Sequence, residues 1–347
     1  MPELPEVEAA RQLLHDFCRG KRVEKAVCAD DDKVIQGVSP ADLQKALQGK
    51  TIKDALRKGK NLWLEFHEGP PALMSGRFHL GMTGSLAVKG IPRVQYVNAT
   101  NANDEWPPKY WKITLEMEGG VHAAFCDPRR FGRVKQSADV AAELAHLGFD
   151  PLLSMPALDA FAAMLAKERR GIKALLLDQA FSAGVGNWVA DEVLYQARIH
   201  PEQKASTLTA EQASALHEQL QGVLQVAVKA GADSEKYPPG WLFHQKWTAG
   251  RGKGPAPTLD GHRIEVAKVA GRTTAFVPDL QKLPAGAQSA GRKAATKKAP
   301  EGEAPSAMPA RARKAPGKRR KPEEREDDED EADAEGQEEE EDCSVTT

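Results

Sequence analysis

Hydrophobic periodicity changes once along this chain, near residue 135, and this change limits the folds that the chain can adopt. After an opening helix, predicted from Pro5 to Gly20, short apolar runs alternate with turns rich in Gly, Pro, Asp and Lys, which is typical of β-strands. Beyond that point the apolar residues recur at helical spacing instead. The sequence therefore predicts an α+β protein in which a β-sandwich or flattened barrel precedes a helical domain.

The predicted elements fall into groups that define the domain organisation. Strands are expected at 23–29, 51–57, 62–67, 72–79, 85–88, 111–117, 121–126 and 131–135. Helices are expected at 158–167, 172–179, 188–197 and 210–229, and a closing hairpin at 263–266 and 273–277. The expected domains are a sandwich with its opening helix at 1–135, a linker at 136–150, and helices with the hairpin at 151–285.

The last part of the chain, 286–347, differs from the rest in composition. Nearly all large apolar residues disappear, a basic cluster occupies 311–321, and an acidic run occupies 323–342. Such a segment buries too little apolar surface to fold, so we expect it to be disordered. It is either a solubilising tail or a nuclear address that contacts DNA or histones loosely. Because its acidic run offsets a mildly basic body, the formal net charge of −2 says little about partners.

Several classes of function are disfavoured by features that the sequence lacks. There is neither an apolar run of about 18 residues, as a membrane span requires, nor a signal peptide. The four cysteines, Cys18, Cys28, Cys126 and Cys343, show no CxxC pair and no spacing typical of a metal site. We expect an intracellular protein with reduced thiols, no metal, no cofactor and no membrane partner.

The residues that follow Met1 have two interpretations. Pro5 and Glu6 are ordinary choices for a first helical turn, but Pro2 and Glu3 are not explained by helix capping. Removal of Met1 would leave Pro2 with a free secondary amine, which can attack a sugar carbon and form an iminium ion. The α-amino reference pKa of roughly 7.7–8.0 leaves part of such an amine neutral at physiological pH. A neighbouring Glu3 could then move protons to and from the sugar or the departing base.

Two segments of the chain suit nucleic-acid binding, although each also has an ordinary structural explanation. In FSAGVGN, Asn187 is the predicted N-cap of a helix, and helix N-termini bind phosphate. The alternative is a simple capped turn. In FCDPRRFGRV, Arg129 and Phe131 suit contacts to base edges and insertion between bases. The alternative is a turn in which one arginine neutralises Asp127.

Two further segments add apolar and basic side chains to this set. Met82 lies in a glycine-flanked turn, where a flexible apolar side chain is poorly buried. Arg57, Lys58 and Lys60 come just before a predicted strand. Taken together, the four segments predict a nucleic-acid-binding protein without naming a reaction.

Five segments, in this order, resemble the formamidopyrimidine-DNA glycosylase family and its endonuclease VIII relatives: PELPEVE, RKGKNLWLE, HLGMTGS, DPRRFGR and IKALLLDQAFSAGVGNWVADEVLYQARIHP. The resemblance covers about residues 2–283 and implies a bifunctional DNA glycosylase and AP lyase of base excision repair. The implied partner is double-stranded DNA with oxidised bases or abasic sites, bound by a monomer. PELPE favours the formamidopyrimidine branch. An endonuclease VIII-like glycosylase for oxidised pyrimidines and a non-catalytic DNA-binding protein remain alternatives.

The resemblance implies four catalytic residues. Pro2 is the expected nucleophile at C1′, and Glu3 is the expected acid and base. Glu6 is expected to support that site, and Lys60 to contact a phosphate beside the lesion. β,δ-Elimination would then release the sugar and leave a one-nucleotide gap.

The resemblance also implies a DNA-binding set. Met82, Arg129 and Phe131 are expected to fill the void left by the flipped nucleotide, with Arg129 facing the orphan base. Asn187 is similar to the phosphate-binding asparagine of the helix–two-turns–helix motif, which belongs to the helical DNA-binding domain.

The chain departs from many bacterial members in having no four-cysteine zinc finger. Its segment 259–279 instead resembles the zincless finger of plant, fungal and some endonuclease VIII-like members, a hairpin held without metal. Arg272 then matches the finger arginine that contacts the lesion phosphate. The charged tail also fits the plant-like branch, and we therefore expect a nuclear protein.

A second departure concerns the substrate. The segment 231–257 does not resemble the bacterial loop that caps flipped 8-oxoguanine. We therefore expect 8-oxoguanine to be a poor substrate, and formamidopyrimidines, hydantoins and abasic sites to be better ones.

Overall fold

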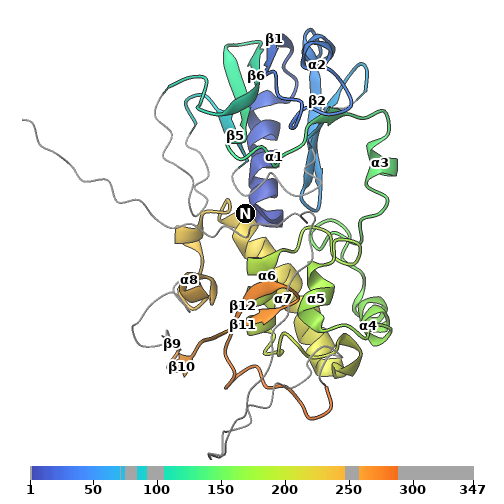
Figure 1. The fold of residues 1–347 in the computed structure, drawn as a ribbon, viewed down its shortest axis with the longest axis vertical. Helices are drawn as coiled ribbons and strands as arrows, with labels where there is room; N and C mark the ends of the chain where they lie inside the picture. The colour runs from blue at the N-terminus through green and yellow to red at the C-terminus, as the bar shows by residue number, and fades with distance from the viewer. Residues whose placement is uncertain (1, 71, 75–83, 92–104, 247–257, 288–347) are drawn as a thin grey trace, which may run out of the picture. The chain divides into compact units, whose positions relative to one another are not determined.

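The fold was analysed in a computed structural model, which describes residues 2–70, 72–74, 84–91, 105–246 and 258–287 (Figure 1). Met82, the loop at 250–257, Cys343 and nearly all of the expected tail lie outside the described residues. Within the described part, three cysteines, Cys18, Cys28 and Cys126, are free thiols. No helix in this part is long and apolar enough to cross a membrane.

The chain enters the fold through helix α1 (Leu4–Cys18). Glu3 is its N-cap, and Glu3 and Glu6 form a capping box in which each side chain accepts a hydrogen bond from the other residue's backbone N–H. Pro5 sits in the first turn, where its missing N–H costs nothing. The opening helix is therefore confirmed, and it begins one residue earlier than Pro5.

Two four-stranded antiparallel sheets form the N-terminal domain, which confirms the sandwich (Figure 1). The first sheet has the order β1 (Val23–Cys28), β6 (Trp111–Met117), β7 (Val121–Cys126), β5 (Ser85–Val88). The second has the order β2 (Ile52–Lys58), β3 (Asn61–Phe66), β4 (Ala72–Met74), β8 (Lys135–Gln136). A short helix, α2 (Pro40–Leu47), joins β1 to β2.

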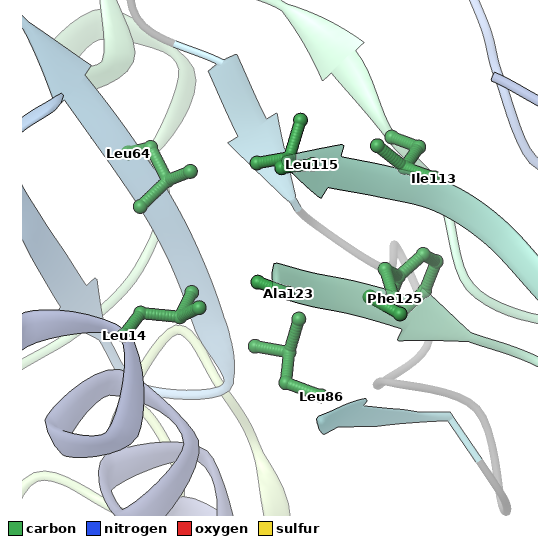
Figure 2. A pocket seen from close by; sticks show the side chains of 8 residues that line it. Leu14, Leu64, Leu86, Ile113, Leu115, Ala123 and Phe125 are labelled. Atoms are coloured by element: carbon green, nitrogen blue, oxygen red, sulfur yellow. The ribbon is translucent and has the colours of Figure 1, made fainter. Parts of the chain in front are cut away.

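The core of this domain lies where the inner faces of the strands meet α1. Burial alternates along β3, with Leu62, Leu64 and Phe66 inside, as expected for a strand with one covered face. Figure 2 shows Leu14 of α1 and Leu64 of β3 with side chains of β5, β6 and β7 around a small apolar cavity. Its lining offers no polar side chain to orient a ligand, so we interpret it as a packing gap of the core.

The second domain is helical and has its own core. Its main helices are α4 (Leu158–Ala166), α5 (Ile172–Leu177), α6 (Asn187–Gln196) and α7 (Ala210–Lys229). Shorter elements are α3 (Val140–Glu143), η1 (Ala205–Thr207), η2 (Ser234–Lys236) and α8 (Phe243–Lys246). Two small two-stranded sheets follow, β9 (Thr258–Leu259) with β10 (His262–Arg263), and β11 (Glu265–Val269) with β12 (Arg272–Phe276).

Two local predictions were wrong, and one helix was not predicted. The strand predicted at 131–135 is reduced to Lys135–Gln136, because the backbone N–H of Gly132 donates to the Asp127 carboxylate and holds a turn there. The closing hairpin is longer than predicted, since its turn needs only Ala270 and Gly271, both at positive φ. Helix α2 was missed, although Ser39 caps it and a proline opens its first turn.

Candidate active site and DNA-binding surface

Glu3 lies at the N-terminus of helix α6, far away in sequence. Its side chain is buried, and its two carboxylate oxygens accept the backbone N–H groups of Trp188 (2.9 Å) and Val189 (3.0 Å). A helix N-terminus favours an anion because its first N–H groups have no partner within the helix. Two of the backbone N–H groups that this helix N-terminus could offer to a phosphate are therefore taken by a carboxylate of the same chain.

The glycines of FSAGVGN are explained by this close approach. Gly186, not Asn187, is the N-cap of α6, and a Cβ at Gly186 would overlap the Glu3 carboxylate. Gly184 has φ +102°, and a Cβ there would lie 2.6 Å from a methyl group of Leu4. The backbone N–H of Leu4 donates to the Gly184 carbonyl at 3.1 Å. The glycine-rich loop therefore holds the N-terminus of the chain.

Glu6 holds the same segment from the other side. One of its carboxylate oxygens accepts the backbone N–H of Glu3 at 2.8 Å, and the other accepts the indole N–H of Trp188 at 3.0 Å. Burial, and secondarily the charge of Glu3, raises the pKa of Glu6 to about 7. Pro2 is itself buried, next to this fixed backbone. The structure thus brings Pro2, Glu3 and Glu6 together.

Lys60 reaches this site from the turn between β2 and β3. Its ammonium donates to the Val185 carbonyl at 3.0 Å, within the glycine-rich loop. Burial lowers the pKa of Lys60, while the nearby charges of Glu3 and Glu6 act in the opposite direction. The turn can approach the glycine-rich loop so closely because Gly59, at φ +58°, has no Cβ. A Cβ at Gly59 would lie 2.9 Å from the Cβ of Ala183.

The other two basic residues of that segment have structural partners. The Arg57 side chain is 1% exposed and pairs with Glu8 at 2.8 Å and with Asp150 at 2.5 Å. Lys58 donates to carbonyl groups of the segment that follows α3. Burial of the Arg57 ion pairs removes this guanidinium from a DNA surface. The segment predicted to be only a linker, 136–150, therefore contains a short helix and ends in a buried anchor.

Arg129 and Phe131 are exposed together on the turn after β7. The Arg129 guanidinium lies over the Phe131 ring, 5.2 Å from its centre, and residue Phe131 is 46% exposed. Arg130 turns away at φ +58° and donates to both carboxylate oxygens of Asp31. The Asp127 carboxylate accepts the Gly132 N–H at 2.6 Å. An exposed ring beside a guanidinium is suited to contact bases.

Asn187 and Arg272 lie close to one another at the junction of α6 and the β11–β12 hairpin. Asn187 is the first residue of α6, and its side-chain NH₂ donates to the Thr273 carbonyl at 2.9 Å. Arg272 begins β12, is exposed, and its charge acts on Lys60. Side-chain donors of Lys60, Asn187 and Arg272 therefore gather near the buried Pro2–Glu3 segment.

Two residues that hold the site were missed in the sequence. The Gln179 side chain donates to the Val185 carbonyl and accepts the Gly184 N–H, so it fixes the glycine-rich loop. The Trp188 indole N–H donates a hydrogen bond to the Glu6 carboxylate. The only signal for either was its position next to the glycines. Within the described ranges, no group of three or more His, Cys, Asp and Glu residues is arranged to hold a metal ion.

Comparisons with known proteins agree with this geometry. Residues 1–134 match the formamidopyrimidine-DNA glycosylase N-terminal domain, and residues 147–238 match the formamidopyrimidine-DNA glycosylase H2TH domain. The chain is 47% identical over 287 residues to formamidopyrimidine-DNA glycosylase of Arabidopsis thaliana, covering 82% of this chain and 71% of the relative. It is 34% identical over 296 residues to the Gluconobacter oxydans protein, covering 81% of this chain and 100% of the relative.

Solved structures of Lactococcus lactis formamidopyrimidine-DNA glycosylase share this fold. One, bound non-covalently to DNA with an AP site, has a TM-score of 0.64 and 27% identity, covering 81% of this chain and 99% of that chain. Another, in complex with DNA containing an oxidised pyrimidine, has a TM-score of 0.63 and 26% identity, covering 81% of this chain and 100% of that chain. The chain therefore belongs to the formamidopyrimidine-DNA glycosylase family of base excision repair, whose members are DNA glycosylases and AP lyases.

Proposed function

We propose that this protein removes oxidised bases from double-stranded DNA and cleaves the resulting abasic site through a Schiff base on Pro2. The main support is how firmly the residues after Pro2 are held. Glu3 is fixed by two backbone N–H groups of α6, and its own N–H is fixed by Glu6. A nucleophile needs such preorganisation, whereas a protein that only binds DNA does not.

The proposed chemistry uses the free amine that removal of Met1 would create. The Pro2 nitrogen bonds to C1′ as the glycosidic bond breaks, and the base leaves with the electron pair and gains a proton. Opening of the sugar ring gives an iminium ion. Loss of a C2′ proton expels the 3′ phosphate, and a further proton loss expels the 5′ phosphate, which completes β,δ-elimination. Water then hydrolyses the iminium ion, which frees the Pro2 amine and releases the unsaturated sugar fragment. Glu3 is the proposed carrier of these protons, supported by Glu6.

The proposed DNA surface surrounds that amine. The N–H donors for phosphates next to the lesion come from Lys60, Asn187 and Arg272. Contacts to phosphate groups fix the register of a protein on DNA. Arg129 and Phe131 are proposed to fill the space left by the flipped nucleotide. The proposed third member of that set, Met82, lies outside the described residues.

We further propose that 8-oxoguanine is a poor substrate compared with formamidopyrimidines and hydantoins. The support comes from the segment that would have to cap the flipped base. Its described part packs Tyr237, Trp241 and Phe243 around Trp188 of α6, and all three are buried. Side chains committed to this core are not available to close over a base.

Single-turnover base release from matched duplexes tests this proposal. Each duplex carries a formamidopyrimidine, a hydantoin, 8-oxoguanine, an oxidised pyrimidine or an abasic site. We expect fast processing of the first two and of the abasic site, with a gap of one nucleotide as product. Efficient 8-oxoguanine release would contradict the substrate proposal. A preference for the oxidised pyrimidine would favour the endonuclease VIII-like alternative, and no base release at all would favour the non-catalytic one.

The plant-like, zincless branch is proposed on two grounds. Identity to the Arabidopsis thaliana relative, 47%, exceeds that to the Gluconobacter oxydans relative, 34%. The described part of the β11–β12 hairpin contains neither His nor Cys. Metal analysis of the purified protein tests this proposal, and a stoichiometric zinc ion would contradict it.

Nuclear localisation and monomeric DNA binding are also proposals. The basic cluster at 311–321 supports the first, and lies outside the described residues. A fluorescent fusion should enter the nucleus of cultured eukaryotic cells and lose this preference when 311–321 is deleted. Exclusion of the intact fusion from the nucleus would contradict the proposed nuclear localisation.

Light scattering of the protein–duplex complex tests the proposal that one protein molecule binds the duplex.

A further inference from the structure

A buried ion cluster lies beneath the β11–β12 hairpin, apart from the residues proposed for chemistry. Asp191 of α6 accepts the Lys173 ammonium at 2.5 Å with one carboxylate oxygen and the Lys246 ammonium at 2.5 Å with the other. The three side chains are 1%, 0% and 5% exposed. Burying charges is costly unless every group is paired and hydrogen-bonded, so the arrangement calls for a structural reason.

The cluster reaches the backbone of Arg272 through Thr274. The Lys173 ammonium donates to the Thr274 hydroxyl at 2.6 Å, and this hydroxyl donates to the Arg272 carbonyl at 3.1 Å. Asp191 also accepts the backbone N–H of Ala275 at 3.2 Å. A continuous chain of polar contacts therefore runs from α5 and α6 to the residue that begins β12.

The same cluster reaches Asn187 from the opposite side. The Lys246 ammonium donates to the Asn187 carbonyl at 3.0 Å, and the Asn187 side chain donates to the Thr273 carbonyl at 2.9 Å. Both proposed phosphate-binding residues, Asn187 and Arg272, are thus tied to one buried carboxylate.

The hairpin needs such an attachment. A two-stranded sheet is marginally stable by itself, and β11 pairs only with β12 in the described structure. Ala275 of the hairpin and Val277, which directly follows β12, pack with Leu242 and Tyr195. Apolar packing is not directional, however, and fixes the distance between surfaces better than the register between them. The hydrogen bonds from Ala275 N–H to Asp191 and from Lys173 to the Thr274 hydroxyl supply that register.

We propose that Lys173, Asp191, Lys246 and Thr274, the anchoring cluster, set the position of Arg272 relative to Asn187 so that both bind one DNA phosphate. The inference rests on the proposed function, because it takes Arg272 and Asn187 to be phosphate ligands. The members of the anchoring cluster are positioning residues, since they are buried away from the DNA. The hairpin is thereby fixed by hydrogen bonds to a buried ion cluster of the helices.

Thr274→Val tests the proposal with the smallest change, because it removes only the hydroxyl. The measurement is the Kd for a duplex with a tetrahydrofuran abasic analogue, as a function of salt. We expect Thr274→Val to weaken binding about tenfold, as for residues coupled in one hydrogen-bond network, and to reduce the salt slope by about 0.9, as for one lost phosphate contact. Thr274→Ser keeps the hydroxyl and should bind like wild type. Thr258→Val, an exposed change in β9, is the matched control.

A double-mutant cycle with Arg272→Ala separates positioning from general structural damage. If Thr274 acts through Arg272, Thr274→Val should cause little further loss in the Arg272→Ala protein. Equal losses in both backgrounds, or no loss in wild type, would overturn the proposal. If Arg272→Ala itself leaves the salt slope unchanged, this result contradicts the proposed phosphate contact of Arg272. It does not bear on the contacts between the anchoring cluster and the hairpin.

Lys246→Met provides a second, independent variant. Its side chain keeps most of its apolar bulk but loses the donors to Asp191 and to the Asn187 carbonyl. Its effect should depend on Asn187 in the same way, so that Lys246→Met causes little further loss in an Asn187→Ala protein. Circular dichroism checks folding of each variant. If Thr274→Val does not fold, the Lys246→Met cycle decides: independence from Asn187 would overturn the proposal.

Discussion

Glu6 is a buried carboxyl whose ionisation should cost folding stability, and Glu6→Gln isolates this effect. The pKa of Glu6 rises from 4.5 to about 7, primarily because burial disfavours the charged form. The folded protein therefore binds this proton more tightly than the unfolded chain does. The corresponding stabilisation is fully present below about pH 4.5 and is lost as the pH rises through about 7.

The magnitude follows from the two pKa values. A rise from 4.5 to about 7 corresponds to about 3 kcal/mol in full, and to about 2.5 kcal/mol between pH 5 and pH 8. Glutamine does not titrate, so Glu6→Gln removes this pH dependence. Glutamine also has only one acceptor oxygen for the two donors, Glu3 N–H and Trp188 indole N–H, which adds a cost that is the same at both pH values.

The assay is urea unfolding of wild type and Glu6→Gln at pH 5 and pH 8. The stability of the variant relative to wild type should improve by about 2.5 kcal/mol from the lower to the higher pH. Titrating groups that do not interact with Glu6, such as the buried Glu192, cancel in this difference. Glu118→Gln, an exposed change in the turn between β6 and β7, should track wild type at both pH values. A stability difference between wild type and Glu6→Gln that is independent of pH would refute the reasoning.

Two further substitutions test the packing around the terminus. Gly186→Ala should abolish base release in single-turnover assays, because its Cβ would displace the Glu3 carboxylate; unchanged release would contradict the docking of Glu3 on α6. Asp150→Asn should lower the free energy of unfolding by about 3 kcal/mol in urea, because it leaves the buried Arg57 short of a partner. The exposed Asp159→Asn should change it by less than about 0.5 kcal/mol, and an equal effect of the two would contradict this role of Asp150.

Local patterns predicted much of the fold. Strands β6 and β7 were predicted with their observed bounds, because two glycines mark the turn between them and apolar residues alternate with polar ones along β6. Helix α7 was also predicted with its observed bounds, and the capping box of Thr209 and Gln212 fixes its start. The strand predicted at 131–135 is shorter in the structure because the backbone N–H of Gly132 donates to the Asp127 carboxylate and not to a neighbouring strand.

The site was less accessible to sequence reasoning because its contacts join distant segments. The N-terminus of α6 was predicted to bind an anion, and it does, but the anion is the Glu3 carboxylate, which no local pattern near Asn187 reveals. The anchoring cluster likewise joins α5, α6, α8 and β12. A lone lysine such as Lys173 is ordinary in sequence, and only burial beside Asp191 makes it informative.

Borohydride trapping tests the central claim, covalent catalysis by Pro2, most directly. The protein, processed to remove Met1, is mixed with a duplex that contains an abasic site, and the iminium ion is reduced to a stable adduct. We expect an adduct that maps by mass spectrometry to the N-terminal peptide at Pro2. We expect no adduct with Pro2→Gly, or with Met1 retained and Pro2 therefore an amide. No adduct from correctly processed protein, or an adduct on another residue, would contradict covalent catalysis by Pro2.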